Sequence, residues 1–178
     1  MQRYYWIRFG KFLAGEYPIS IYDQDPNCLL RELIDIGITY FLDLTEKNEK
    51  NLPQYLTLLK QIASMQALTV QHKRIPVPDF GVPSVECMTK ILRTVHNALK
   101  SRKLVYVHCF AGLGRTATVA GCYFVEQGMD GDEALQEIER IQQGTCFGGS
   151  VSPITDEQRQ MVKDWVEYRG NSNVTEDR

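Results

Sequence analysis

The most constraining feature of this sequence is a short apolar run that leads straight into a glycine-containing loop. Leu104–Val107 are consecutive apolar residues between polar neighbours. Such a run is typical of a strand buried on both faces at the centre of a sheet. Gly112 and Gly114 follow in the loop, and residues 115–127 have the pattern of a helix. We therefore expect a loop that joins a central strand to a helix.

The other predicted elements alternate along the chain. Residues 4–13 predict an opening strand or hairpin, and apolar patterns predict strands over 38–44 and 68–77. Helices are expected over 28–36, about 53–63, 84–100 with Ser84 as N-cap, 130–143 and 155–168. Strands separated by helices predict an α/β fold, a single domain with a central, mostly parallel sheet flanked by helices on both faces. The domain would span residues 1–170, and 171–178 would form a polar, frayed tail.

The charge balance excludes a general attraction to polyanions. Lys and Arg total 20 and Asp and Glu total 22 among the 178 residues, a formal net charge of -2. Because no global positive field exists, we expect no nucleic-acid partner and no stable membrane association. No run approaches the ~18 apolar residues of a spanning helix. Any recognition of an anion must be local.

The cysteines indicate reduced thiols. There are five, with no Cys-x-x-Cys pair and only three histidines, so neither zinc-site spacing nor a dense disulfide framework is visible. The odd count and the absence of a secretory leader predict a cytoplasmic protein that holds no metal. Four of the thiols are expected to be core or partly buried: Cys28, Cys87, Cys122 and Cys146.

The fifth, Cys109, lies where the central strand ends. In an open α/β sheet, ligands bind outside the carboxyl ends of the strands. A loop with two glycines can bring successive backbone N–H groups together around an anion, and the next helix adds its positive N-terminal end. Arg115 supplies a planar fork that matches two phosphate oxygens. These groups also favour the thiolate of Cys109, so the segment predicts nucleophilic attack on a bound phosphate monoester.

The string His108, Cys109, five residues, Arg115 and Thr116 resembles the signature of the cysteine-dependent protein tyrosine phosphatase superfamily. The size of the chain and the segment Phe12–Pro18 resemble its smaller dual-specificity branch. The resemblance implies a catalytic domain with a sheet flanked by helices. It also implies a hydrolysis in two steps through a phosphocysteine, with no metal and no other cofactor.

The resemblance also implies a role for each residue of the signature. The phosphate loop would comprise Phe110, Ala111, Gly112, Leu113, Gly114 and Arg115, whose amides and guanidinium hold the phosphate oxygens. Thr116 would donate a hydrogen bond to the cysteine sulfur and help to release it. His108 would hold the backbone of the loop rather than transfer protons.

A protein alkoxide or phenoxide is a poor leaving group, so a carboxylic acid should protonate it and later activate water. In the family this acid is an aspartate on a loop upstream of the cysteine, and Asp79 fits, in a loop with prolines on both sides. Asp43, inside an apolar strand-like segment, is the weaker candidate. Gln158 matches one water-positioning glutamine of the large tyrosine phosphatases, but Ile154 stands where the other would be.

Several alternatives remain open at this stage. We expect a monomer that acts on phosphorylated protein substrates, on phosphotyrosine and also on phosphoserine or phosphothreonine through a shallow pocket. The alternatives are a phosphoinositide or other non-protein phosphatase, and a phosphate-binding module without turnover. The uncharged loop residues disfavour the lipid alternative. One of the other cysteines could form a protective disulfide with Cys109, and the sequence does not choose which.

Overall fold

The computed structural model describes residues 1–20 and 23–172. Its centre is a five-stranded sheet in the order β1-β2-β5-β3-β4. The strands are β1 (Tyr4–Arg8), β2 (Phe12–Gly15), β3 (Tyr40–Asp43), β4 (Gln71–Arg74) and β5 (Val105–His108). Only the pair of β1 and β2 is antiparallel, so the sheet is mostly parallel.

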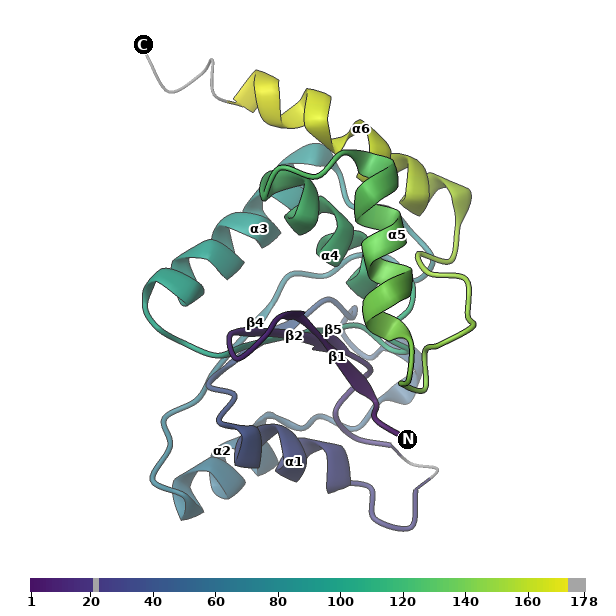
Figure 1. The fold of residues 1–178 in the computed structure, drawn as a ribbon. Helices are drawn as coiled ribbons and strands as arrows, with labels where there is room; N and C mark the ends of the chain where they lie inside the picture. Colours follow the sequence, from purple (N-terminus) through teal and green to yellow (C-terminus); the bar gives the residue numbers. More distant parts are fainter. Residues whose placement is uncertain (21–22, 173–178) are drawn as a thin grey trace.

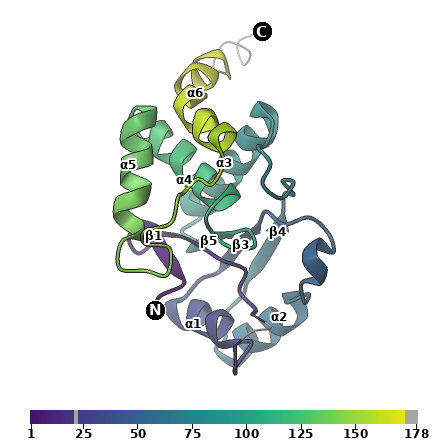
Figure 2. The ribbon, with the colours of Figure 1, turned by 90° about the vertical axis from the view of Figure 1, so that its right-hand side faces the viewer.

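Helices cover both faces of this sheet. They are α1 (Cys28–Ile36), α2 (Leu56–Met65), α3 (Val85–Lys100), α4 (Arg115–Glu126), α5 (Gly131–Gln142) and α6 (Asp156–Ser172). Figures 1 and 2 show α1 and α2 on one face and the other four helices on the opposite face. Each face has its own apolar core. The predicted α/β fold with a mostly parallel sheet flanked on both faces is confirmed.

The strand register places the predicted nucleophile at the middle of one sheet edge. His108, the last residue of β5, pairs with Gly15 of β2 on one side and with Asp43 of β3 on the other. Cys109 follows directly, so it lies at the carboxyl end of the central strand. This is the edge at which open α/β sheets bind ligands.

Helix α4 fixes the position of the residues that follow the loop. All its residues from Arg115 to Val125 are buried, because α3, α5 and α6 pack around it. A helix that is apolar on all sides belongs inside a protein. At Gly121 a methyl group would lie 2.7 Å from a Val162 side-chain carbon, so the close approach of α4 and α6 requires glycine there.

Two helix boundaries differ from the expected ones. Helix α2 begins at Leu56 rather than near Pro53. The Pro53 carbonyl instead accepts a hydrogen bond from the Tyr17 hydroxyl at 2.9 Å. Helix α6 continues through Ser172, so residues 171 and 172 of the expected frayed tail are helical, and 173–178 lie outside the described residues.

The expectation for the secondary cysteines is partly wrong. Cys122 is buried in α4 and Cys87 is half-buried, but Cys28 and Cys146 are exposed. Cys28 begins α1, whose buried face consists of Leu29, Leu30, Leu33 and Ile34. All five cysteines are free thiols.

Candidate active site

Four segments of the chain meet around Cys109, which is 3% exposed. Its side chain lines a cavity of about 160 Å³. The other lining residues are Lys50, Asp79, Phe80, Phe110, Ala111, Gly114, Arg115, Ile154 and Gln158. The sequence-predicted nucleophile, arginine, acid and glutamine are thus brought together. Gly112, Leu113, His108 and Thr116 do not line the cavity.

The loop after Cys109 turns its carbonyl groups outward. Phe110 O accepts from Tyr17 N (2.8 Å), Gly112 O from Tyr5 Oη (3.2 Å), Leu113 O from Ser152 Oγ (2.8 Å) and Gly114 O from Thr118 N (2.9 Å). Within the described part of the chain, the amides of residues 110–114 donate to no protein acceptor. A loop whose carbonyls are bound outside and whose amides remain available is suited to hold an anion.

Gly112 allows this loop to approach β2. Its φ angle is +75°, in the left-handed region, and a methyl group there would lie 2.7 Å from the Gly15 carbonyl carbon. Both the backbone conformation and the space therefore require glycine. This close contact packs the loop directly against the end of β2.

His108 supports the backbone at Cys109. It is completely buried, with Nδ1 3.2 Å from Cys109 O and Nε2 2.7 Å from Tyr55 Oη. A carbonyl oxygen can only accept, so Nδ1 donates to it and Nε2 accepts from the Tyr55 hydroxyl. Burial lowers the pKa of His108, in agreement with this neutral tautomer. Both ring nitrogens are engaged, which leaves none for proton transfer in the cavity.

Arg115 is held by groups from two other loops. Its guanidinium, only 2% exposed, binds both carboxylate oxygens of Glu49 at 2.7 Å. It also donates to Val77 O at 2.9 Å and to Asp79 Oδ1 at 2.9 Å. Glu49 lies in the short 3-10 helix η1 (Glu49–Asn51), and sequence reasoning missed it. The only signal was a charged stretch after β3, which carries no spacing rule of its own.

Asp79 is bound by two cations. Lys50 Nζ lies 2.9 Å from its Oδ2, and Arg115 lies 2.9 Å from its Oδ1. Burial acts to raise the pKa of Asp79, but the hydrogen bond from Lys50 and the charge of Arg115 outweigh it, so the pKa is lowered. In these ion pairs Asp79 is therefore a carboxylate that occupies part of the arginine fork.

Apolar side chains surround the mouth of the cavity. Phe80 is 59% exposed and Ile154 is 38% exposed. Lys50 Nζ lies 4.6 Å from the ring centre of Phe110 and 5.8 Å from that of Phe80. Phe80 has a φ angle of +58°, a strained conformation for a bulky residue and one that is often found at functional sites.

Gln158 connects this mouth to α6. It is fully buried, its Oε1 accepts from Ile154 N at 3.2 Å, and its Nε2 donates to Gly81 O at 3.0 Å. Its amide also borders Gly114, where an added methyl group would lie 3.0 Å from Oε1. In this arrangement the glutamine joins the loop of Asp79 to the end of the phosphate loop through backbone contacts.

One sequence expectation differs from the geometry. The Thr116 hydroxyl is buried and has no hydrogen-bond partner, so the expected bond to the Cys109 sulfur is not formed. The direction of this side chain is not specified by the sequence pattern. Asp43, the weaker acid candidate, is fully buried and binds Thr45, His72 and Arg74. It ties the ends of β3 and β4 together and does not line the cavity, in agreement with the preference for Asp79.

Residues 1–20 and 23–172 contain no cluster of three or more His, Cys, Asp and Glu side chains with metal-ligand geometry. None of the helices in these ranges has the length and apolar character needed to cross a membrane.

Comparisons with known proteins agree with this geometry. Residues 23–129, more than half of the chain, match the model of a family described as a polymorphic toxin system, DSP-PTPase phosphatase. A segment of 95 residues, 52% of the chain, is 35% identical to a phosphatidylinositol 3,4,5-trisphosphate 3-phosphatase and protein-tyrosine-phosphatase, PTEN1, of Arabidopsis thaliana, and covers 22% of that protein.

Two further matches cover most of the length of the protein that is compared with this chain. A probable protein tyrosine phosphatase type IVA A of Dictyostelium discoideum is 25% identical over 130 residues, 64% of this chain and 78% of that protein. The crystal structure of Tk-PTP in its active form is similar with a TM-score of 0.68 and 28% identity, over 93% of this chain and 97% of that one.

Proposed function

We propose that this chain, which belongs to the DSP-PTPase phosphatase family, is a metal-independent protein phosphatase that acts on phosphotyrosine through a phosphocysteine intermediate. The observation that carries the proposal is the single cavity that Cys109, Arg115 and Asp79 line together, with the apolar side chains of Phe80, Phe110 and Ile154. Residues 1–170 form the catalytic domain in this proposal, and no cofactor takes part.

In the first step the Cys109 thiolate attacks phosphorus. A bond between sulfur and phosphorus forms as the bond from phosphorus to the ester oxygen breaks, and Asp79 gives its proton to that oxygen. In the second step Asp79 takes a proton from water, the water oxygen bonds to phosphorus, and the thiolate leaves. The loop amides and Arg115 stabilise the charge on the equatorial oxygens in both steps.

The ion pairs of Arg115 suggest that phosphate binds before Asp79 becomes protonated. A phosphate that enters the fork replaces Asp79 as the partner of Arg115, while Glu49 keeps the guanidinium in place from the other side. The carboxyl of Asp79 then keeps only Lys50 of its two cationic partners and faces a dianion, which raises its pKa and favours the protonated acid. Binding of substrate thereby prepares the acid that the first step needs.

The rim supports an aromatic substrate. Phe80, Phe110 and Ile154 offer apolar surface on which the ring of phosphotyrosine can pack, and aromatic pairs add roughly 0.5–1.5 kcal/mol beyond area burial. Phosphoserine and phosphothreonine bring no ring to this surface, so we expect them to be slower substrates. The relatives include both protein and lipid phosphatases by name, which makes a phosphoinositide the alternative substrate.

The test compares matched substrates. Wild-type enzyme should hydrolyse an aryl phosphate and a phosphotyrosine peptide in the presence of a chelator, and Cys109→Ser should lose activity on the order of 10⁴-fold or more. Unchanged turnover in Cys109→Ser, or a requirement for a divalent metal, contradicts the mechanism. A higher kcat/KM for a phosphoinositide than for every phosphopeptide contradicts the substrate class. Tight phosphopeptide binding without hydrolysis would indicate a binding module instead.

A further inference from the structure

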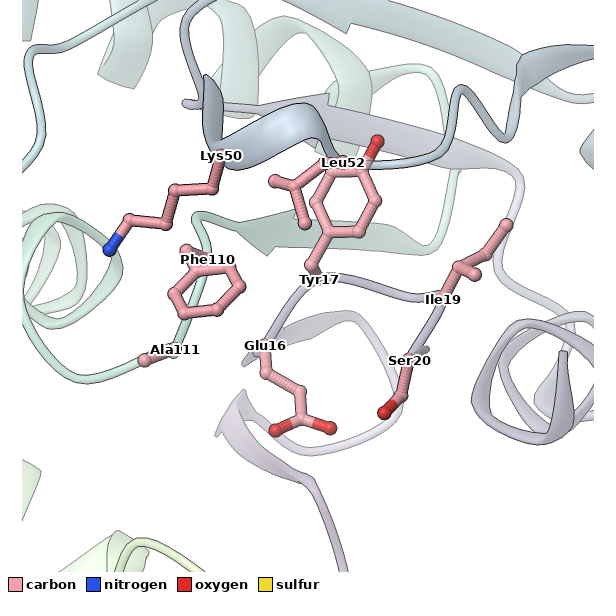
Figure 3. A pocket seen from close by; sticks show the side chains of 8 residues that line it. All are labelled: Glu16, Tyr17, Ile19, Ser20, Lys50, Leu52, Phe110 and Ala111. Carbon is pink, nitrogen blue, oxygen red and sulfur yellow. The ribbon is translucent and has the colours of Figure 1, made fainter. Parts of the chain in front are cut away.

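A second cavity of about 220 Å³ adjoins the catalytic one. The two share Lys50, Phe110 and Ala111, so the same wall borders both. Figure 3 shows the Phe110 ring between the Lys50 side chain on one side and the Glu16 carboxylate on the other. A group bound in the catalytic cavity therefore has the second cavity as its immediate neighbour.

The floor of the second cavity is apolar. Tyr17 and Ile19 are 3% and 8% exposed, and Leu52 is half-buried beside them. Tyr17 is fixed at both ends, because its backbone N–H donates to Phe110 O and its hydroxyl to Pro53 O. A methylene chain that enters the cavity gains about 25 cal/mol for each Å² of apolar surface removed from water.

The charges around the cavity are unequal. Glu16 has Arg3 as its cationic partner, at 3.1 Å, and Arg3 is shared with Asp23. Two carboxylates thus share one guanidinium and leave a net negative charge at this wall. Burial acts first to raise the pKa of Glu16, and Arg3 offsets this only in part. On the other wall the charge of Lys50, which also lines the catalytic cavity, is balanced by Asp79 or, once Asp79 is protonated, by the bound phosphate.

We propose that the second cavity is a specificity subsite that takes a basic side chain, Lys or Arg, next to the phosphorylated residue of a protein substrate. The methylene stem packs on Tyr17, Ile19 and Leu52, and the cationic head reaches the Glu16 carboxylate. The inference rests on the proposed function and deepens it. An acidic neighbour, or a second phosphate on an inositol ring, meets the net negative wall and is disfavoured.

The experiment uses one alanine-flanked phosphotyrosine peptide with Arg, Gln or Glu substituted singly at each position from -3 to +3. At one position, kcat/KM for Arg should exceed that for Glu about tenfold, which corresponds to about 1.4 kcal/mol, with Gln between them. Glu16→Gln should reduce this ratio to about twofold or less. Asp23→Asn should reduce it less, because Asp23 acts only through Arg3.

The matched control is Asp132→Asn, whose carboxylate pairs with Lys163 at 2.7 Å between α5 and α6. It removes one negative charge outside the cavity and should keep the wild-type ratio. Equal rates for Arg and Glu at every position in wild-type enzyme overturn the proposal, as does an unchanged ratio in Glu16→Gln. If no phosphopeptide is hydrolysed but a phosphoinositide is, the proposed function itself has failed. Hydrolysis without a flanking preference removes only the subsite.

Discussion

The two sides of the catalytic cavity are built in different ways. On one side, the phosphate loop is held by uncharged hydrogen bonds to its outward carbonyls from β1, from Tyr17 after β2 and from α4. On the other, Glu49 and Asp79 hold Arg115 through ion pairs, and Lys50 forms an ion pair with Asp79. Lys50 and Phe80 have φ angles of +48° and +58°. The first side is complete before substrate arrives. The second must exchange one of its ion pairs when phosphate binds.

The difference has a physical reason. Amide donors that hold an anion are useful only at fixed positions, since a shift of about 1 Å can cost 10²-fold in rate. A group that serves as the acid in the first step and as the base in the second must, in contrast, change its protonation state during the reaction. An ion pair that a phosphate can replace satisfies that requirement, whereas a rigid hydrogen bond would not.

The largest expected effect comes from disturbing the side of the cavity that the phosphate loop forms, which we call the rigid side. In Gly112→Ala the new methyl group would collide with Gly15 and the left-handed φ would be strained, so the loop must move. We expect a loss of roughly 10²-fold or more in kcat/KM toward an aryl phosphate, measured by steady-state kinetics. The expected loss of stability is about 1–3 kcal/mol, measured by denaturant unfolding.

Gly144→Ala is the matched control for this variant. Gly144 has a φ of +79°, similar to that of Gly112, but an added methyl group meets nothing within 4 Å. It should show the cost of backbone strain, about 1 kcal/mol, without loss of activity. Equal activity losses in the two variants would mean that contact with β2 does not position the loop.

The second-largest effect is expected on the other side of the cavity, where ion pairs hold Arg115. Asp79→Asn should lower kcat on the order of 10²-fold, because the leaving oxygen has no proton donor. Its affinity for inorganic phosphate should rise, since Asp79 no longer competes for Arg115. Isothermal titration calorimetry with phosphate measures this directly.

Glu49→Gln removes the other carboxylate that binds Arg115 and should have the opposite effect on phosphate affinity. Without the carboxylate that holds both of its terminal nitrogens, Arg115 is less well placed and phosphate should bind more weakly. If Asp79→Asn also weakens phosphate binding, the two carboxylates do not have the different roles that we assign to them.

A smaller effect is expected from Lys50→Met, on pH dependence rather than on maximal rate. The first step needs protonated Asp79, so the descending limb of the profile of kcat/KM against pH reports its pKa in the free enzyme. Lys50 holds that pKa down, and its removal allows the pKa to rise. The descending limb should therefore move to higher pH. Lys47→Met, an exposed lysine of the same segment, should leave it in place.

The sequence predicted the parts of the molecule that depend on local pattern. The apolar run before His108, the helix periodicities and the N-cap at Ser84, which accepts from Cys87 N at 3.2 Å, agree with the structure. The position of Cys109 at the carboxyl end of β5 followed from the same pattern. These features need no knowledge of which distant segments come together.

The missed features all depend on contacts between distant segments. Glu49 reaches Arg115 across 66 positions, and Tyr5 reaches Gly112 across 107. A charged stretch after a strand does not reveal which of its carboxylates turns inward. The exposure of Cys28 and Cys146 could not be derived either, because Cys28 is the first residue of α1 and Cys146 lies in a turn after α5, where no periodic pattern indicates burial.

The smallest effect on stability is expected at Thr116, the second residue of α4. Its buried hydroxyl has no partner, and an unsatisfied buried donor costs about 1–3 kcal/mol. Thr116→Val keeps the shape and removes the unpaired group, so stability should stay equal or rise by up to about 1 kcal/mol, as thermal unfolding would measure.

The same variant distinguishes a structural hydroxyl from a functional one. We propose that Thr116 turns toward the sulfur when the phosphoenzyme breaks down and stabilises the departing thiolate. Thr116→Val would then accumulate phosphoenzyme, and rapid mixing with an aryl phosphate should show a burst of product followed by slow turnover. If the variant gains stability and shows no burst, the hydroxyl contributes nothing to the second step, and the rigid side acts through its amides and Arg115 alone.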